Sequence, residues 1–254
     1  MNHPPQLGVQ LYSVRDHLGP ELGRTLERLA RLGYTHAEPY DIVSDPVALR
    51  SALDAAGLRA TTAHAKITEL GRDAVLPAAE LLGVTTVVVP FVDRATFDER
   101  DRVLRLAERI NSEVDPAAQR GIRLGYHNHD FELAASVDGR PAYELLVENL
   151  DERVVLELDT YWASVGGADV FDLLRRHGER IRLLHVKDEP LRPGETPARV
   201  DLTGRSQEVL ALARTVTGLE LPVVEIVVDD AQLWPALERN ARFFRQALAT
   251  EDAR

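Results

Sequence analysis

The sequence contains no cysteine, so it can form neither disulfides nor thiolate metal sites. It also lacks long apolar runs: the longest, Val84–Val92, includes two threonines and a proline and is too short to cross a membrane. The first residues, Met-Asn-His-Pro-Pro, have neither the charged nor the apolar segment of a signal peptide. We therefore expect a soluble cytoplasmic protein with no membrane partner.

Positive charge is scarce as well. Against 41 acidic residues there are only 30 lysines and arginines, and the net charge of −11 argues against a nucleic-acid partner. Only two are lysines, Lys66 and Lys187, and each follows a histidine by two residues, His64 and His185. Lysine supplies a compact ammonium with an adjustable pKa, which arginine cannot. The two lysines are therefore candidates for chemistry, with chance survival as the alternative.

Short β-branched runs alternate with helical patterns along the chain. The runs are Leu7–Tyr12, Thr35–Glu38, Arg59–His64, Thr85–Pro90, Arg123–His127, Val154–Asp159, Ile181–Val186 and Pro222–Val227. The predicted helices are Glu21–Leu32, Asp45–Ala56, Asp73–Leu82, Thr96–Gln119, Tyr143–Glu148, Val170–His177, Gln207–Val216 and Ala231–Leu248. Thr96 and Glu99 read as a capping box that starts the fourth helix.

Eight strand–helix units of about 32 residues each predict an α/β fold of the (β/α)8 TIM-barrel type. A doubly wound open sheet is the rival. The segment after the first strand, Tyr12–Arg15, is however not a glycine-rich phosphate loop. No linker, low-complexity segment or block of charge divides the chain, so residues 1–254 are predicted to form one barrel domain.

Polar side chains recur on the inward face of the predicted strands, near their C-terminal ends. Side chains two residues apart share a face of a strand. This inward set comprises Gln10, Glu38, His64, Lys66, His127, His129, Glu157, Asp159, His185, Lys187 and Glu225. A charge inside a barrel must be paired or bound to a metal, and the C-terminal end of a TIM barrel carries the active site. We therefore place the functional site at that end.

The residues near these strand ends include a carboxylate–imidazole set without sulfur: Glu132, Asp159, His185 and Glu225, with His64, His127 and His129 nearby. Such a set suits one Mn²⁺, Mg²⁺, Co²⁺ or Zn²⁺ ion with open positions for substrate oxygens. The ion would polarise a carbonyl, carboxylates would shuttle the proton, and Lys187 and Lys66 would steady an enediolate or a phosphate. Glu157 is interpreted as an ion-paired residue of the barrel interior. For His64, a ligand role and a wall role stay open.

Several segments resemble one known family. They are Leu7–Asp16 (LGVQLYSVRD), Tyr126–Glu132 (YHNHDFE), Glu157–Trp162 (ELDTYW), Gly166-Gly167 and His185–Asp188 (HVKD). These segments are similar to the sugar phosphate isomerase/epimerase family of the xylose-isomerase-like TIM barrels. The resemblance extends from Leu7 to about Leu248, and it implies a xylose-isomerase-like barrel with one divalent metal ion.

The resemblance also implies roles for individual residues. The implied metal ligands are Glu132, Asp159, His185 and Glu225. Glu132 and Glu225 would also be the acid–base pair, assisted by Lys187, and a shifted alignment replaces Glu132 by His127. Trp162 stands where ketose epimerases place a substrate-contacting histidine, so the sugar must be held differently. The predicted substrate-binding residues are Gln10, Glu38, His64, Lys66, His127, His129 and Trp162.

Two departures from the family pattern bear on the reaction. Val224–Val227 (VEIV) replaces Val-Glu-Gln-Asp at the eighth strand, and Pro193–Arg199 replaces a Gly-Glu-Gly turn. We predict a metal-dependent isomerase or epimerase that abstracts a proton next to the carbonyl of a sugar or keto-sugar. Its partner is a small-molecule sugar or polyol, and homo-oligomers are common in the resembling family. The alternatives are a keto-sugar or inosose dehydratase (a lyase), an endonuclease IV-like enzyme, which the net charge disfavours, and a non-catalytic sugar-binding barrel.

Overall fold

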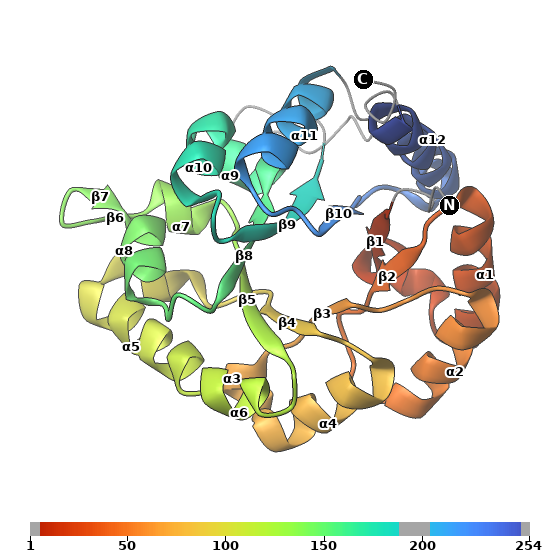
Figure 1. The fold of residues 1–254 in the computed structure, drawn as a ribbon, viewed down its shortest axis with the longest axis horizontal. Helices are drawn as coiled ribbons and strands as arrows, with labels where there is room; N and C mark the ends of the chain where they lie inside the picture. Colours follow the sequence, from red (N-terminus) through yellow and green to blue (C-terminus); the bar gives the residue numbers. More distant parts are fainter. Residues whose placement is uncertain (1–5, 188–203, 250–254) are drawn as a thin grey trace.

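Eight parallel strands form the centre of the computed structural model, which describes residues 6–187 and 204–249 (Figure 1). The predicted turn replacement, Pro193–Arg199, lies outside these ranges. Around the sheet the order is β2-β1-β10-β9-β8-β5-β4-β3. The strands are β1 (Gly8–Gln10), β2 (His36–Glu38), β3 (Thr62–His64), β4 (Thr86–Val89), β5 (Arg123–His127), β8 (Val155–Asp159), β9 (Ile181–Val186) and β10 (Leu221–Val224). Each of them overlaps one of the eight predicted runs.

The sheet closes on itself between β2 and β3. In the described part of the chain no continuous ladder joins these two strands, but a parallel bridge pairs His36 with Arg59. The Ala37 N–H donates to the Arg59 carbonyl at 2.8 Å, and the His64 N–H donates to the Pro39 carbonyl at 2.8 Å. These bonds complete a nearly closed barrel and confirm the predicted (β/α)8 fold.

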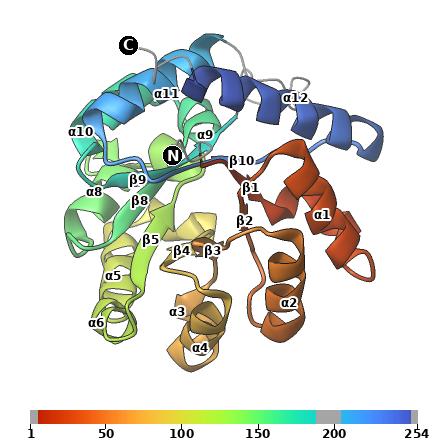
Figure 2. The same cartoon turned by 45° about the vertical axis from the view of Figure 1, so that its right-hand side comes forward.

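Helices surround the strands on the outside of the barrel (Figures 1 and 2). The longer ones are α1 (Leu22–Leu32), α2 (Pro46–Ala56), α4 (Arg72–Leu82), α5 (Arg100–Asn111), α8 (Ala142–Asn149), α10 (Val170–His177), α11 (Gly204–Val216) and α12 (Asp230–Ala249). Capping residues mark the ends of these helices, as α2 shows. The Asp45 carboxylate accepts the Ala48 N–H at the start of α2, and Gly57 ends that helix in the left-handed conformation, with φ of 69°.

Shorter elements lie between the strands and the longer helices, most of them at the C-terminal end of the barrel. Those described are η1 (Leu11–His17), α3 (Ile67–Leu70), η2 (Arg94–Asp98), α6 (Val114–Ala118), α7 (Phe131–Ala134), β6 (Ser136–Val137), β7 (Arg140–Pro141) and α9 (Thr160–Val165). Of these, η1, α3, α7 and α9 follow directly after strands β1, β3, β5 and β8. The chain therefore turns back close to each of these strand ends, which keeps the polar residues there in fixed positions.

The continuous helix predicted over Thr96–Gln119 is wrong, and so is its capping box. The segment divides into η2, α5 and α6. The Asp93 carboxylate caps η2, while Glu99 has an extended backbone (φ −139°) and pairs with Arg102 at 2.9 Å instead of making a side-chain cap. Further along, Pro116 has no N–H to donate to the carbonyl four residues before it, which disfavours one continuous helix through α5 and α6.

An apolar plug, defined as Val88, Leu183, Leu221 and Val223, fills the barrel interior below the C-terminal strand ends. Two glycines, Gly8 on β1 and Gly125 on β5, leave room for plug residues on the strands beside them, β10 and β4. A Cβ atom added to Gly8 would lie 3.0 Å from Val223 Cγ2, and one on Gly125 would lie 3.1 Å from Val88 Cγ2. The polar groups at the strand ends therefore stand on a packed apolar floor.

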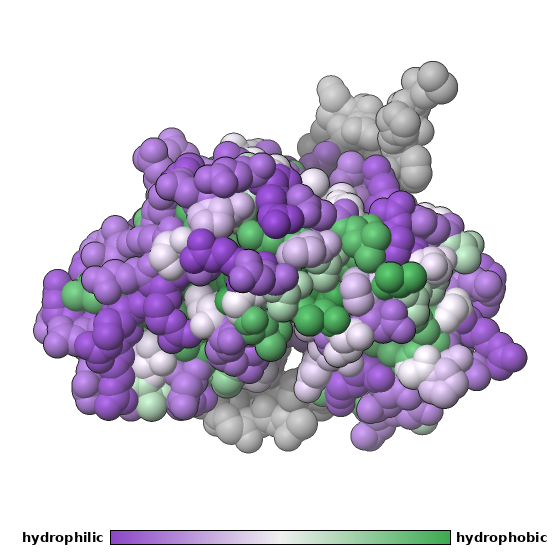
Figure 3. Space-filling model, turned by 90° about the horizontal axis from the view of Figure 1, so that it is seen from below, coloured by the Kyte–Doolittle hydropathy of each residue, from purple (hydrophilic) through white to green (hydrophobic). Residues whose placement is uncertain are grey.

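The outer surface carries no membrane-spanning element in the ranges that the structure describes, since no helix there is both long and apolar enough. Figure 3 shows one face of the molecule, on which hydrophilic residues predominate toward the edges and hydrophobic residues gather nearer the middle.

Candidate functional site

Titratable side chains from most of the strands meet at the C-terminal end of the barrel. They form two layers that share two histidines. The inner network consists of Gln10, Glu38, His64, His127, Glu157 and His185. The upper group consists of His127, Asp159, His185 and Glu225. Both layers lie where the inward parity of the strands predicts polar side chains.

Three imidazoles share one oxygen of Glu157. Its Oε2 lies 2.6 Å from His64 Nε2, 3.0 Å from His127 Nδ1 and 3.3 Å from His185 Nε2. An ionised carboxylate only accepts hydrogen bonds, so ring nitrogens donate to it. Glu157 is buried, and its Oε1 has no partner among the described residues. Glu157 is therefore ion-paired inside the barrel, as its strand position predicts.

Glu38 is the second buried carboxylate that contacts His185. Its Oε1 accepts from His185 Nε2 at 2.7 Å and from the Gln10 amide at 2.9 Å, and the Thr62 hydroxyl donates to its second oxygen. Burial raises the pKa of Glu38, but His64 and His185 outweigh it and bring that pKa to about 2. Glu38 is therefore an ionised anchor below the upper group.

The three imidazoles differ in protonation. Burial lowers the pKa of each, but the surrounding carboxylates raise the pKa of His64 above its ordinary value and that of His185 well above it. The pKa of His127 stays well below its ordinary value, because burial acts together with the neighbouring positive charges of His185 and His64. His127 is therefore neutral at pH 7. With its proton on Nδ1 toward Glu157, it carries a lone pair on Nε2.

The upper group brings four potential metal donors together. The donor atoms of His127, Asp159, His185 and Glu225 all lie within 4.8 Å of one another. His127 Nε2 is 3.9 Å from Asp159 Oδ2, and His185 Nδ1 is 3.1 Å from Glu225 Oε2. Asp159 Oδ1 accepts the Trp162 N–H at the start of α9 (2.9 Å), which leaves Oδ2 facing the group. Three of the four predicted ligands are therefore neighbours.

A second set of donors satisfies the same distance limit within the inner network: His64, His127, Glu157 and His185. This set contains only one of the four predicted ligands, His185, whereas the upper group contains three. We therefore take the upper group as the candidate metal centre.

The two lysines take different places. Lys187 Nζ lies 2.7 Å from Asp159 Oδ2 and 2.7 Å from Glu225 Oε2, and its side chain is only 14% exposed. Burial lowers the pKa of Lys187, but the two carboxylates raise it above its ordinary value. Lys66 is 44% exposed and lies 3.6 Å from Glu69. The shared sequence pattern therefore puts one lysine inside the upper group and the other away from it.

Glu132 does not join the other three predicted ligands. Its Oε1 accepts from the Tyr126 hydroxyl at 3.0 Å and its Oε2 from the His129 N–H at 2.9 Å. Among the described residues, neither set of donors close enough to hold a metal ion contains it. Tyr126 alternates with the inward-facing His127 along β5, so the carboxylate that it bonds lies behind that strand. His127, the residue favoured by the shifted alignment, lies with Asp159, His185 and Glu225 instead. Burial raises the pKa of Glu132 to about 7.

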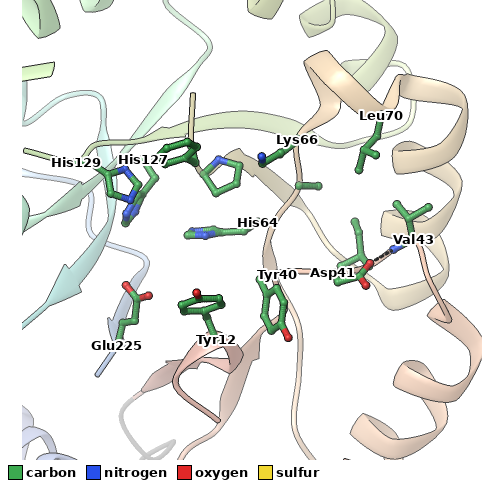
Figure 4. Close-up of a pocket in the computed structure, with 14 residues that line it drawn as sticks. Tyr12, Tyr40, Asp41, Val43, His64, Lys66, Leu70, His127, His129 and Glu225 are labelled. Carbon is green, nitrogen blue, oxygen red and sulfur yellow. Dashed lines mark hydrogen bonds between the residues drawn. The ribbon is translucent and has the colours of Figure 1, made fainter. Parts of the chain in front are cut away.

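A cavity of about 560 Å³ opens over the upper group (Figure 4). Its polar side carries His64, His127, His129 and Glu225. The rings of Tyr12 and Tyr40 meet edge to face across 5.3 Å between centroids and form part of the wall, and Val43 and Leu70 lie toward the far end. A ligand here would meet imidazoles and Glu225 at one end, and Val43 and Leu70 together with the Asp41 carboxylate at the other.

The predicted substrate-binding residues fall into two sets. Those that line the cavity are His64, Lys66, His127 and His129. Gln10 and Glu38 are fully buried in the inner network instead. Trp162 lies beside the upper group, with its ring centroid 5.9 Å from that of His129. The Nδ1 atom of His129 is buried without a hydrogen-bond partner in the described part of the chain.

Two contributors to the site escaped the sequence analysis. The Asn128 side chain accepts the Asp159 N–H at 2.9 Å and donates to the Asp159 carbonyl at 3.2 Å, so it ties the end of β5 to the end of β8. Strand parity places Asn128 on the outer face and gave no reason to consider it. Phe91 lines the cavity and is 43% exposed. An aromatic residue directly after an apolar strand was the available signal.

The chain is similar in sequence to known proteins. The sequence profile described as the xylose isomerase-like TIM barrel matches residues 26–205. Inosose dehydratase from Salmonella agona (strain SL483) is 31% identical over 99 residues, which are 39% of this chain and 32% of that protein. The match therefore spans about a third of that relative's length.

Solved structures share the fold over nearly the whole chain. A sugar phosphate isomerase/epimerase from Parabacteroides distasonis matches with a TM-score of 0.78 at 24% identity, over 96% of this chain and 94% of that one. A D-psicose 3-epimerase, crystallised in the presence of D-fructose, matches with a TM-score of 0.65 at 20% identity, over 97% and 98% of the two chains. At these identities the likeness establishes the common barrel.

Proposed function

The chain belongs to the xylose isomerase-like TIM barrel family, and from this premise we propose that it is a metal-dependent isomerase or epimerase of a sugar or keto-sugar. The reaction would move a proton next to the substrate carbonyl. One observation carries the proposal: the four donors of the upper group lie within 4.8 Å of one another at the edge of a ligand-sized cavity. A small-molecule sugar or polyol is the expected substrate class.

The donor set fits a single divalent ion. The imidazoles would bind through His127 Nε2 and His185 Nδ1, and the two carboxylates through one oxygen each. The other nitrogen of each ring faces a buried carboxylate, Glu157 for His127 and Glu38 for His185. Such outer carboxylates orient metal-binding histidines and make them stronger ligands. When bound, an ion of this kind polarises a carbonyl and acidifies the neighbouring C–H bond.

Glu225 is the carboxylate that we assign to proton abstraction, because it lines the cavity beside the upper group. His129 faces the same space. Burial lowers the pKa of His129 to about 4, so the ring that it presents to the cavity is neutral at pH 7. Glu132, the second predicted acid–base residue, reaches the cavity only through its bond to the His129 backbone. Its direct role in proton transfer therefore stays a prediction.

A dehydratase is the second candidate, favoured by the 31% identity to an inosose dehydratase over 99 residues. The first step would be the same: Glu225 takes the proton next to the carbonyl and leaves an enediolate. Expulsion of a β-hydroxyl, instead of return of the proton, would then give water and an unsaturated ketone. The two reactions differ in their products and need no difference in the metal-binding residues.

The test begins with elemental analysis of the purified protein, followed by removal of any ion with a chelator and reloading with Mn²⁺, Mg²⁺, Co²⁺ or Zn²⁺. Each form is incubated in D2O with D-psicose, D-fructose or an inosose, and the products are examined by NMR. We expect about one ion per chain. We also expect deuterium at the carbon next to the carbonyl, with turnover lost on chelation and restored on reloading.

Each result separates the candidates. Deuterated ketose without loss of water supports an isomerase or epimerase, whereas an enone product identifies a dehydratase. Turnover that persists at full rate after complete removal of metal contradicts metal dependence. Sugar binding without turnover in any loaded form contradicts both enzymes and supports a non-catalytic barrel.

A further inference from the structure

Two carboxylates at the heart of the upper group share one internal cation. Asp159, at the end of β8, and Glu225, just after β10, each place one oxygen 2.7 Å from the Lys187 ammonium. Asp159 is fully buried, and the side chains of Glu225 and Lys187 are only 13% and 14% exposed. At such depth water screens little of the repulsion between the carboxylates, so the ammonium holds them together.

The ammonium engages the same oxygens that face the two histidines. Asp159 Oδ2 is the atom nearest His127 Nε2 (3.9 Å), and Glu225 Oε2 is the atom nearest His185 Nδ1 (3.1 Å). A divalent ion bound by these four donors would need both oxygens. It would also stand within a few ångströms of an ammonium of the same sign, where repulsion is strong at low dielectric.

We propose that Lys187 is a built-in competitor of the metal ion, which occupies the metal position in the ion-free protein and must leave both carboxylates before a divalent ion binds. This inference rests on the proposed metal centre. It adds an exchange between two cations at that centre: the ion enters as the ammonium moves away. The Trp162 ring, whose centroid is 5.6 Å from Nζ, offers the displaced ammonium an aromatic face.

The choice of lysine at this position is consistent with such an exchange. The chain uses arginine for nearly all its other cations and has only one other lysine. A guanidinium would bind two carboxylates through a rigid, planar set of donors. A lysine ammonium, at the end of four methylenes, can instead move away when the side chain changes rotamer. The side chain at position 187 must therefore be able to release its partners as well as bind them.

The first test compares Lys187→Met with the wild type and with Lys66→Met. The control removes the other lysine, which also follows a histidine by two residues but pairs with exposed Glu69. Mn²⁺ or Zn²⁺ alone is titrated calorimetrically into chelator-treated protein, and the melting temperature is recorded without metal. For Lys187→Met we expect metal affinity to rise at least about tenfold. We also expect the ion-free protein to melt about 5 °C or more lower. Lys66→Met should match the wild type in both.

The second test observes the wild-type protein and uses a variant only to assign its signals. With only two lysines, protein labelled with ¹⁵N-lysine gives at most two side-chain NH3⁺ signals, and Lys66→Met assigns them. In the ion-free protein the Lys187 signal should be sharp, because its protons are hydrogen-bonded and shielded from water. Addition of Zn²⁺ should shift it or exchange-broaden it, while the Lys66 signal stays in place.

The outcomes distinguish this inference from the proposed function. If Zn²⁺ binds with equal affinity to wild type and Lys187→Met and the Lys187 signal does not move, the exchange is wrong but the metal centre stands. If neither protein binds any divalent ion, the metal centre and the exchange are both wrong. Tighter binding by Lys187→Met, or a Zn²⁺-dependent change of the Lys187 signal, supports the exchange.

Discussion

His127 donates its Nδ1–H to Glu157 Oε2 across 3.0 Å, and this bond decides which ring nitrogen keeps a lone pair for a ligand. With Nδ1 engaged below, Nε2 points to the Asp159 side of the cavity. A residue buried one layer beneath the site thus sets the tautomer of a residue in it.

The first prediction concerns Glu157→Gln. The amide removes the negative charge that three histidines share, so His127 loses the partner that fixes its tautomer. We expect metal affinity to fall about 10- to 100-fold, as measured by competition with a chelating dye. The control is Glu144→Gln, which removes a carboxylate that lies 3.2 Å from His177 away from the site. Equal affinity in both variants would mean that Glu157 does not support the centre.

The second prediction separates metal binding from helix capping at Asp159. Both Asp159→Ala and Asp159→Asn should lose the ion, because each lacks the carboxylate. Only alanine also loses the bond from the Trp162 N–H that starts α9. We expect Asp159→Ala to be about 1 kcal/mol less stable than Asp159→Asn. Elemental analysis and urea unfolding of chelator-treated protein measure the two effects. Full metal content in either variant would remove Asp159 from the ligand set.

The third prediction decides between the two candidates for the fourth ligand. His127→Ala should lose most of the bound metal, whereas Glu132→Gln should retain it, because the carboxylate of Glu132 is engaged by Tyr126 and the His129 N–H. Glutamine can accept from the His129 N–H and donate to the tyrosine oxygen, so the local fold is preserved. The reverse result, with metal lost only from Glu132→Gln, would restore Glu132 as the ligand.

The fourth prediction concerns pH. Burial raises the pKa of Glu132 from 4.5 to about 7, so between these values the folded protein holds a proton that the unfolded chain releases. The contribution of Glu132 to the free energy of unfolding is therefore complete below pH 4.5 and is lost as pH rises through about 7. Glu132→Gln should remove this loss, worth about 1–3 kcal/mol at pH 8. Urea unfolding at several pH values, with chelator present, measures it, and parallel profiles for the two proteins would refute it.

The fold could be predicted because its signals are local and repeated. Each β-branched run can be recognised as a strand from its own residues, and the alternation with helices implies the parallel barrel. The helix over Thr96–Gln119 failed because a competing cap at Asp93 and an interior Pro116 break a pattern whose apolar spacing continues through them. The spacing of apolar residues indicates which face of a segment is buried, but not where the backbone hydrogen bonds of its helices end.

Strand parity predicts those residues of the site that lie on the strands or at their ends. Parity places Asp159, His185 and Glu225 inward, and these three do meet. It cannot orient Glu132, which lies in the single-turn helix α7 beyond the strand and folds back onto Tyr126. Nor can it find Asn128, whose two bonds to Asp159 depend on how closely neighbouring strand ends approach. Such details depend on tertiary distances that no single segment encodes.

Because of the apolar plug, the polar layers of the barrel are reached from its C-terminal end. Val88, Leu183, Leu221 and Val223 seal the interior below the polar layers, and Gly8 and Gly125 let them close without a gap. Under the proposed function, an ion and a sugar would both enter past residues such as Tyr12, Tyr40 and Phe91. A sugar over the centre would then stand between the bound ion and bulk solvent, so the ion would have to bind first and could be exchanged only after the product had left.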